Sequence, residues 1–409
     1  MENIFQKTRI EDLCLKVTSG GTPSRSNPEY YEGEIPWVKT GELNGWYIDD
    51  TAEKITEEAL KKSSAKIYPI GTVLMAMYGD GRTIGSTAIT RIFSASNQAC
   101  CAMIPDPNKC DSLYLHYSLV VHRDTIVKLA LGGAQRNLNQ ATIKNFEITA
   151  PDLKKQSEIA SLISNYDYLI ANNNRRIAIL EEMAQSLYRE WFVKFRYPGH
   201  ENQKLIESPL GLIPEGWEVK LIQDFGSVIT GKTPSTTNPA YYSQKDIPFL
   251  KTPDMHGSIF ATDISDYLSI DGANSQKNKF IPKNSICVSC IGAKAGVVAV
   301  TPTTVQTNQQ INSIVLFDLK HREYMYLFAV SLHQKIHAIG SSGATMTNVS
   351  KGKFETIEII NPPNKLMEEF HGYTKNMFDG ILNLQLRNAN LRAQRDMLLP
   401  KLISGEILL

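Results

Sequence analysis

The sequence predicts an α+β protein in which two copies of a mixed α/β module alternate with two long helices that form an antiparallel coiled coil. Two observations predict this fold: an internal repeat within the 409 residues, and two helical stretches with heptad spacing. The repeat is far longer than the periods of solenoid proteins. We therefore expect two whole domains of one fold that perform one task twice.

The repeat is clearest in a polar loop. The sequence TPSRSNPEYY at 22–31 returns as TPSTTNPAYY at 233–242, and IPWVKT at 35–40 returns as IPFLKT at 247–252. The dipeptide Asn97-Gln98 likewise returns as Asn308-Gln309. Within each copy, the apolar runs 71–78 and 284–291 end in glycine-containing loops, and we expect them to be corresponding β-strands.

The first helix is predicted between the two modules, because 155–195 contains neither proline nor glycine. Mostly apolar residues recur there by four and three, which is typical of a coiled-coil seam, and a polar residue in such a seam fixes the register. At 1.5 Å per residue, a helix over about 156–192 spans roughly 55 Å. A single amphipathic surface helix is the alternative interpretation. The seam positions are Ile159, Ile163, Tyr166, Ile170, Asn173, Ile177, Leu180, Ala184, Leu187 and Trp191.

The second helix is predicted at the C-terminus, with a weaker seam of the same spacing. Two helices that each follow a globular module pair most simply with each other, and antiparallel pairing puts the modules at opposite ends. Pro400 is expected to kink or end this helix near Leu399. The seam positions are Phe370, Thr374, Met377, Ile381, Leu384, Asn388, Leu391, Arg395, Leu398 and Leu402.

Composition narrows the class of protein. The chain is 42% hydrophobic and 21% charged, as in soluble globular proteins, and its net charge is +1. A DNA-binding surface would therefore be a local patch rather than a global basic field. Six cysteines in a chain of this length suit a reducing compartment, and no leader-like or membrane-spanning run is evident. We expect a cytoplasmic protein with no membrane partner.

Several motifs suggest chemistry that their surroundings do not support. Residues 226–233 match the phosphate-binding P-loop pattern, but Pro234 and Pro239 follow where a helix should begin. The stretch 361–364 is similar to the Asn-Pro-Pro-aromatic motif of amino-methyltransferases, but Asn364 replaces the aromatic that would stack on an extruded base. We expect a boundary between module and helix there, and neither catalysis nor metal binding in this chain.

Three further segments carry a family resemblance. IPEGWEV at 213–219 is similar to the opening of a target-recognition domain, AQSLYREWF at 184–192 to the end of a first spacer helix, and LLPKLISGEI at 398–407 to the tail of a second. Together with the order module, helix, module, helix, they make the chain resemble specificity (S) subunits of type I restriction–modification systems. The resemblance covers essentially the whole chain.

The resemblance implies a non-catalytic DNA-reading subunit, in which each domain reads one half of a bipartite, asymmetric site. The helices are expected to set the spacing of the half-sites and to dock two DNA-methyltransferase subunits and a restriction motor–nuclease subunit. S-adenosylmethionine, ATP and magnesium are expected on those partners, and no cofactor in this chain. The implied domains are a target-recognition domain at 1–153, a spacer helix at 154–197, a linker with the second target-recognition domain at 198–363, and a second spacer helix at 364–409.

The candidate DNA contacts fall into two groups. Segments shared by both copies offer hydroxyls, amides and cations suited to phosphate, although the first loop suits a purely conformational role equally well. Segments that differ between the copies are expected to read bases, since two halves of an asymmetric site need different side chains. The shared residues are Thr22, Ser24, Arg25, Lys39, Thr40, Asn97, Gln98, Thr233, Ser235, Thr236, Lys251, Thr252, Asn308 and Gln309. The divergent residues are Tyr78, Arg82, Thr83, Gln135, Arg136, Asn137, Lys294, Thr345, Thr347 and Asn348.

Two other functions stay open at this stage. A self-contained restriction–modification enzyme would carry out its chemistry in this chain, and a pure interaction scaffold would bind proteins through both modules. The sequence does not reveal the target bases, because base reading depends on the detailed geometry of the loops.

Overall fold

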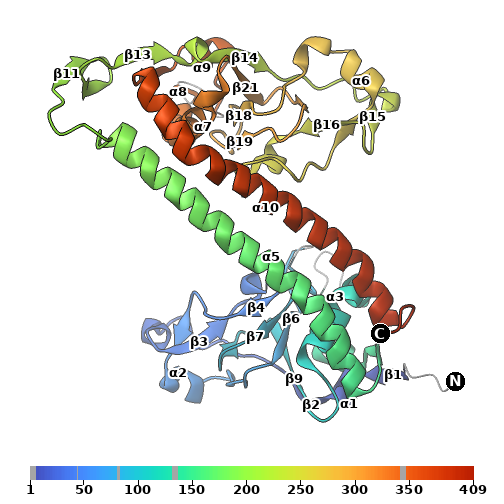
Figure 1. The fold of residues 1–409 in the computed structure, drawn as a ribbon. Helices are drawn as coiled ribbons and strands as arrows, with labels where there is room; N and C mark the ends of the chain where they lie inside the picture. Colours follow the sequence, from blue (N-terminus) through green and yellow to red (C-terminus); the bar gives the residue numbers. More distant parts are fainter. Residues whose placement is uncertain (1–5, 44, 81–82, 131–136, 341–346) are drawn as a thin grey trace. The chain divides into compact units, whose positions relative to one another are not determined.

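The structure is a computed structural model that describes residues 6–43, 45–80, 83–130, 137–340 and 347–409. The chain divides into two compact units. Unit 1 comprises Met1–Leu169 and Leu391–Leu409, and unit 2 comprises Ile170–Asn390. Each unit holds one module of strands and short helices together with part of both long helices (Figure 1).

Unit 1 is built on a five-stranded sheet of order β2-β9-β6-β7-β4, beside a three-stranded sheet of order β5-β3-β8 and the antiparallel pair β1-β10. The strands are β1 (Gln6–Arg9), β2 (Cys14–Ser19), β3 (Ile35–Val38), β4 (Tyr47–Ile48), β5 (Lys54–Ile55), β6 (Val73–Ala76), β7 (Thr87–Thr90), β8 (Ala95–Ser96), β9 (Cys100–Pro105) and β10 (Glu147–Ala150). The helices are α1 (Ile10–Leu13), α2 (Glu57–Lys61), α3 (Ser112–Lys128) and α4 (Gln140–Asn145), with 3₁₀ turns η1 (Pro28–Tyr31) and η2 (Thr40–Glu42).

The central strand β6 shows why an uninterrupted apolar run folds here as a strand. Val73 and Met75 enter one hydrophobic core of unit 1, whereas Leu74 and Ala76 enter another. Side chains alternate between the two faces of a strand, so a strand with a core on both faces has no polar positions. The predicted strand at 71–78 is confirmed.

Unit 2 repeats this plan with a four-stranded sheet of order β14-β21-β18-β19, a second sheet of order β15-β17-β16-β20, and the pairs β13-β22 and β11-β12. The strands are β11 (Leu205–Ser208), β12 (Gly211–Pro214), β13 (Glu218–Leu221), β14 (Gly226–Thr230), β15 (Tyr242–Ser243), β16 (Ile247–Leu250), β17 (Tyr267–Leu268), β18 (Ile286–Ser289), β19 (Val298–Val300), β20 (Gln306–Thr307), β21 (Ile311–Leu316) and β22 (Glu358–Asn361). The helices are α6 (Ile270–Asn274), α7 (Arg322–Ser331), α8 (His333–Gly340) and α9 (Lys351–Glu355), with 3₁₀ turns η4 (Ile222–Asp224), η5 (Pro239–Tyr241), η6 (Thr252–Met255), η7 (Lys277–Lys279) and η8 (Leu319–His321).

The two sheets confirm the duplication. Strands β14, β21, β18 and β19 stand in the order of their repeat counterparts β2, β9, β6 and β7, and all the pairings between these neighbours are antiparallel. The stretch that opens the second module, 212–219, is not one continuous strand, although an entry strand is expected there from the sequence. The chain turns at Gly216, whose φ is +85°, so that β12 and β13 belong to different pairs.

The first long helix, α5, covers Leu153–Tyr188 and continues as a π-helical turn over Arg189–Val193. The predicted helix is therefore confirmed at both ends. Its start is fixed by Asp152, whose side-chain Oδ1 accepts a hydrogen bond from the Lys155 backbone N–H at 3.0 Å.

The second long helix, α10, covers Asn364–Ser404, so the expectation that Pro400 ends it is wrong. Proline removes one backbone hydrogen bond and crowds the preceding turn. Burial of Leu399, Leu402 and Ile403 in the same core as Ile159 and Ile163 accompanies the intact final turn. Apolar burial of this kind is the main source of helix stability in proteins and offsets a local defect.

The helices pair antiparallel in both units, which confirms the predicted fold class. In unit 1, Arg395 donates a hydrogen bond to the Asp167 carboxylate. In unit 2, the ring centroids of Trp191 and Phe370 lie 5.8 Å apart, and Asn173 bonds Asn388. All twenty predicted seam residues are buried or half-buried. Of the helices in the described part of the chain, none is long and apolar enough to cross a membrane.

Candidate nucleic-acid interface

The first polar loop has the same internal bonds in both units. The Tyr31 hydroxyl donates to the carbonyl oxygen of Pro23 at 2.7 Å, and the Tyr242 hydroxyl donates to that of Pro234 at 2.9 Å. A hydroxyl pair closes each loop at 2.7 Å, namely Ser24 with Ser26 and Ser235 with Thr237. The loop residues are thus positioned by a scaffold that both copies have kept.

A threonine–glutamine bond attaches this loop to the next shared segment. The Thr22 hydroxyl donates to the side-chain oxygen of Gln98, and the Thr233 hydroxyl donates to that of Gln309 at 2.7 Å. Gly20 allows the close approach that this bond needs, because a Cβ atom there would lie 2.2 Å from the carbonyl oxygen of Asn97. The two shared segments therefore form one surface in each unit, on which both glutamines are exposed.

Backbone hydrogen bonds hold the divergent loops beside the shared segments. In unit 1, the Met77 N–H donates to the backbone carbonyl oxygen of Ala99 at 2.8 Å. The Leu138 N–H donates to the carbonyl oxygen of Met77 at 2.9 Å. In unit 2, the Cys290 N–H donates to the backbone carbonyl oxygen of Gln310 at 2.7 Å. The Val349 N–H donates to the carbonyl oxygen of Cys290 at 2.9 Å. Segments that are distant in sequence are thus brought together, and in the same way twice.

The segment after β3, and its counterpart after β16, joins the same edge. The Asn97 N–H donates to the Val38 carbonyl oxygen at 3.0 Å, and the Asn308 N–H donates to that of Leu250 at 3.3 Å. Lys39 and Lys251 are the next residues in each case. Five segments therefore converge at one edge of each module.

Carboxylates that could not be identified from the sequence hold the cations of the shared segments. The Glu53 carboxylate forms ion pairs with Lys39 Nζ at 2.5 Å and with the Arg25 guanidinium at 2.7 Å. The pKa of the Glu53 carboxyl is lowered, chiefly by the hydrogen bond from Lys39. Asp266 binds Lys251 Nζ at 2.8 Å. The repeat comparison could not reveal this pairing, because the two carboxylates are 213 residues apart, whereas the first polar loops are 211 apart and the two lysines 212 apart. A phosphate would have to compete with them for these cations.

Arg25 is also held by aromatic side chains. Its guanidinium lies 4.0 Å from the ring centroid of Tyr31 and 5.2 Å from that of Trp37. Stacking of this kind fixes the plane of a guanidinium while its edge stays available for hydrogen bonds. Arg25 is therefore oriented as well as charge-paired.

Two of the predicted contact residues are buried, and we remove them from the candidate set. The Thr252 hydroxyl lies 3.3 Å from the Ser289 hydroxyl, and the Thr347 hydroxyl lies 3.1 Å from His337 Nδ1. Both hydroxyls thus have partners inside the protein. The fixed repeat shift could not show this, because Thr40, the counterpart of Thr252, is only half-buried.

Other divergent residues are placed at the surface. Tyr78, Asn137, Lys294 and Asn348 are exposed, whereas the half-buried Thr83 caps its own turn by donating from its hydroxyl to Asp80 at 2.9 Å. Ser24, Ser235 and Thr236 are also exposed. The predicted residues Arg82, Gln135, Arg136 and Thr345 lie outside the described residues.

The P-loop match is not part of a P-loop fold. Gly226 lies in β14 opposite Leu316, and the strand runs into the first polar loop rather than into a helix. The next helical element is the three-residue turn η5. Asn361 ends β22 and Asn364 begins α10, so the Asn-Pro-Pro stretch lies at the expected boundary. Within the described ranges, no three His, Cys, Asp or Glu residues are grouped so that they could hold a metal ion.

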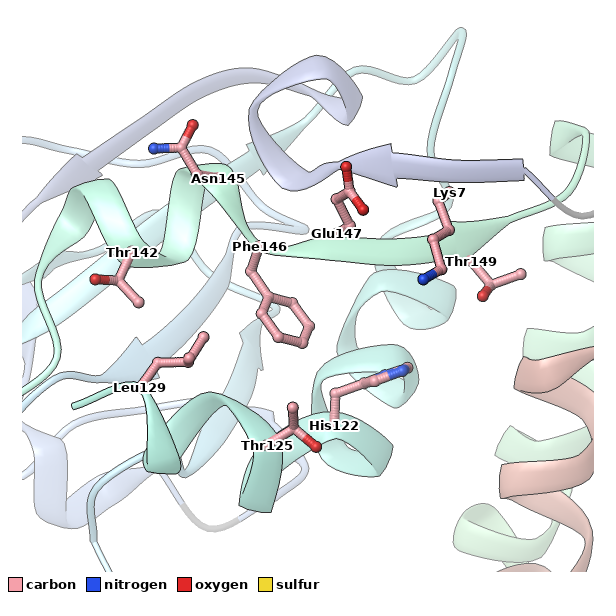
Figure 2. A pocket seen from close by; sticks show the side chains of 9 residues that line it. All are labelled: Lys7, His122, Thr125, Leu129, Thr142, Asn145, Phe146, Glu147 and Thr149. Carbon is pink, nitrogen blue, oxygen red and sulfur yellow. The ribbon is translucent and has the colours of Figure 1, made fainter.

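A separate groove lies elsewhere in unit 1, between α3, α4 and the β1-β10 pair (Figure 2). Its volume is about 560 Å³, and the Phe146 ring points into it beside His122, with ring centroids 5.7 Å apart. Lys7 and Glu147 place opposite charges on its rim. Its lining does not favour one ligand chemistry, and the sequence analysis nominated none of its residues.

These features define a class of protein. It has two copies of one recognition module, each of which presents hydroxyls, amides and cations on converging loops, and a pair of long antiparallel helices. The Type I restriction modification DNA specificity domain matches residues 3–182 and 214–368. Because this match covers most of the chain, the protein belongs to the family of type I restriction–modification specificity subunits.

Relatives and a solved structure agree with this family. The chain is 31% identical to the type I restriction enzyme HindI specificity subunit of Haemophilus influenzae, over 65% of this chain and 70% of that protein. It is 29% identical to the MjaIX specificity subunit of Methanocaldococcus jannaschii, over 98% and 92%. The fold matches the type I S subunit from M. genitalium with a TM-score of 0.65 at 14% identity, covering 98% of this chain and 97% of that one.

Proposed function

We propose that each unit reads one half of a bipartite, asymmetric DNA site. The observation that carries this proposal is the edge built twice from the same backbone bonds, from Ala99 through Met77 to Leu138 and from Gln310 through Cys290 to Val349. The scaffold is kept, while the side chains on the outer loops differ. Two scaffolds of one geometry meet the same duplex shape, and different side chains select different bases.

The shared and divergent groups divide the work between them. Gln98, Gln309 and the hydroxyls of the first loop contact phosphate and fix the orientation of each module. Lys294 and Asn348 in unit 2, with Tyr78 and Asn137 in unit 1, face base edges together with the loop residues that lie outside the described ranges. Because phosphate contacts release counterions, binding weakens steeply as salt concentration rises.

The helix pair serves as spacer and as docking surface for the partners. Buried polar residues at Asn173 and Asn388 hold one register, which fixes the gap between half-sites. Ile179 and Met183, one turn apart on α5, are 48% and 49% exposed. Exposed apolar residues on a helix suit a protein interface, and we assign this face to a DNA-methyltransferase subunit. S-adenosylmethionine, ATP and magnesium act on the methyltransferase and motor–nuclease partners, and this chain is not catalytic.

The experiment combines purified components with DNA and radiolabelled S-adenosylmethionine. We expect no methyl transfer by this chain alone, none by the methyltransferase subunit alone, and transfer when the two are mixed. Sequencing of the methylated product then reports the motif, which is expected to have two defined blocks separated by undefined bases. Methylation by this chain alone, or one contiguous motif, would contradict the proposal.

A further inference from the structure

A second site lies in unit 2, apart from the candidate interface. A pocket of about 230 Å³ is bounded by Glu181 of α5, by the loop after η6 with Ser258, by Gly296–Val298, and by Tyr326 and Val330 of α7. None of the candidate DNA contacts lines it. All of its lining residues belong to unit 2, so the pocket is complete within one compact body.

The charge in this pocket is not neutralised from within the described part of the chain. Glu181 is half-buried, burial raises the pKa of its carboxyl, and none of the described residues forms an ion pair or hydrogen bond with it. Burial, and then the charge of Glu181, raises the pKa of the Tyr326 phenol, so the two groups lie close enough to interact. A carboxylate removed from water is costly unless a cation or hydrogen-bond donors compensate it.

Gln185 and His256, which also line the pocket, can donate, but the two other polar side chains beside Glu181, those of Ser258 and Tyr326, can act as acceptors. The Ser258 hydroxyl already donates its hydrogen to the Phe260 carbonyl oxygen at 2.8 Å, and therefore presents only its lone pairs. An ionised carboxylate only accepts, and a phenol oxygen accepts as well as donates. Guanidinium and ammonium groups are the complement of such a set, because they carry several donors, no acceptor and a positive charge.

The repeat shows that this space is not a requirement of the fold. Gly257 and its counterpart Gly45 have nearly equal φ angles of +83° and +82°, so the two loops turn alike. The next residue is Ser258 in unit 2 but Trp46 in unit 1, where the indole packs against the helix core and lies 5.5 Å from the Tyr168 ring. Unit 2 thus has a small hydroxyl residue where unit 1 has a large aromatic one.

We propose that this pocket binds a guanidinium or ammonium group through Glu181. The group is either an arginine or lysine side chain of a docked protein subunit or a free polyamine. The first source rests on the proposed assembly with partner subunits, whereas the second does not. The pocket supplies one carboxylate for charge and oxygen acceptors for orientation.

The test uses methyl NMR of the full-length chain, with Ile259, Val298 and Val330 as reporters that line the pocket. Arginine amide and spermidine are titrated separately, and citrulline amide serves as the neutral control of similar shape. We expect saturable shifts with at least one cation and none with citrulline amide. Glu181→Gln should weaken binding at least tenfold, while Glu182→Gln, which removes an exposed charge one residue along α5, should not. Ser258→Trp should block binding with Glu181 intact.

A second arm identifies the source of the cation. If Glu181→Gln weakens the association with the methyltransferase subunit at least tenfold relative to Glu182→Gln, the group is a side chain of that partner. If only the free cations depend on Glu181, the group is a small molecule. If both variants behave alike in both arms, the proposal is overturned. The methylated motif is unaffected in either case, so failure here is distinguishable from failure of the DNA-reading function.

Discussion

The side-chain amide of Asn173 donates a hydrogen bond to the side-chain oxygen of Asn388 at 2.8 Å, near one end of the helix pair of unit 2. Asn388 in turn donates to Asn174 at 2.8 Å. Asn173 and Asn388 are 9% and 2% exposed, so neither amide is satisfied by bulk water. A shift of one helix by a turn would bury both amides against apolar neighbours, which makes this pair the register-determining contact of the seam.

The first prediction concerns a substitution that removes the hydrogen bond between Asn173 and Asn388. Asn388→Leu leaves the Asn173 amide buried without its partner, and we expect a loss of roughly 1–3 kcal/mol of stability. Asn172→Leu is the matched control, because Asn172 is exposed and adjacent to Asn173. Thermal unfolding compares the variants, and equal melting temperatures would argue against the assignment. The double variant Asn173→Leu with Asn388→Leu should recover stability but methylate sites of more than one gap.

The second prediction concerns the loss of folding stability at acid pH. His116 of α3 is 1% exposed, and burial lowers its pKa to about 4. Between that value and the usual value of about 6.5, the unfolded chain binds a proton that the folded chain does not. The contribution of neutral His116 to the free energy of unfolding is therefore fully present above about pH 6.5. It is lost as the pH falls toward 4, by about 3 kcal/mol at most.

Substitution of His116 tests this directly. His116→Phe should flatten the part of the melting-temperature curve between pH 6.5 and 4.5, because no imidazole remains to be protonated on unfolding. His256→Phe, at an exposed position, should leave the slope as it is in the unmodified protein. An unchanged slope in His116→Phe would show that another group controls the acid sensitivity.

The helices and the duplication could be predicted because their signals are local or internal to the sequence. Heptad spacing identifies Ile163 and Ile381 as seam residues wherever the helices finally pack, and a repeated loop implies a repeated scaffold. The strand β6 could be predicted from its uninterrupted apolar run. These parts of the fold follow from periodicity and from turn chemistry alone.

The side-chain partners could not be predicted in this way. Glu53 neutralises Arg25 and Lys39 from a segment with no counterpart at the repeat distance, and Thr252 is buried by packing that its own sequence does not reveal. Pro400 remains within a helix because neighbouring leucines are buried, which is a tertiary effect that overrides a local rule. Base-reading residues depend on loop positions, and the assignments made from the sequence stay predictions.

The third prediction tests the helices as a spacer. One heptad inserted into both α5 and α10 keeps the seam in phase and lengthens the pair by about 10.5 Å, equivalent to roughly three base pairs. The added DNA also rotates by about a third of a turn, so some affinity is lost. We expect the same two half-sites with a longer gap in the methylated motif. A four-residue insertion, which breaks the phase, should reduce activity without defining a new gap.

The fourth prediction concerns the P-loop match. Lys232 lies after β14 on a loop, with no helix N-terminus to hold a phosphate. Lys232→Ala should therefore leave methylation by the assembled complex nearly unchanged. Calorimetry should detect no ATP binding by the isolated chain. ATP binding that this substitution abolishes would mean that the interpretation of the motif is wrong.

The fifth prediction addresses the division of labour between the units. Lys294→Ala should relax the half-site read by unit 2, and Arg82→Ala with Arg136→Ala should relax the half-site read by unit 1. Each lost base contact costs roughly 1–3 kcal/mol of discrimination. Lys375→Ala is the control, since it removes an exposed lysine from α10 without touching a loop.

The most direct measurement is a genome-wide map of methylated sites in cells that carry each of these variants as the sole specificity subunit. Two modules that read separately predict degeneracy in one block of the motif for Lys294→Ala, degeneracy in the other block for the double arginine variant, and an unchanged motif for Lys375→Ala. Equal degeneracy in both blocks for either loop variant would contradict the claim that each unit reads its own half of the site.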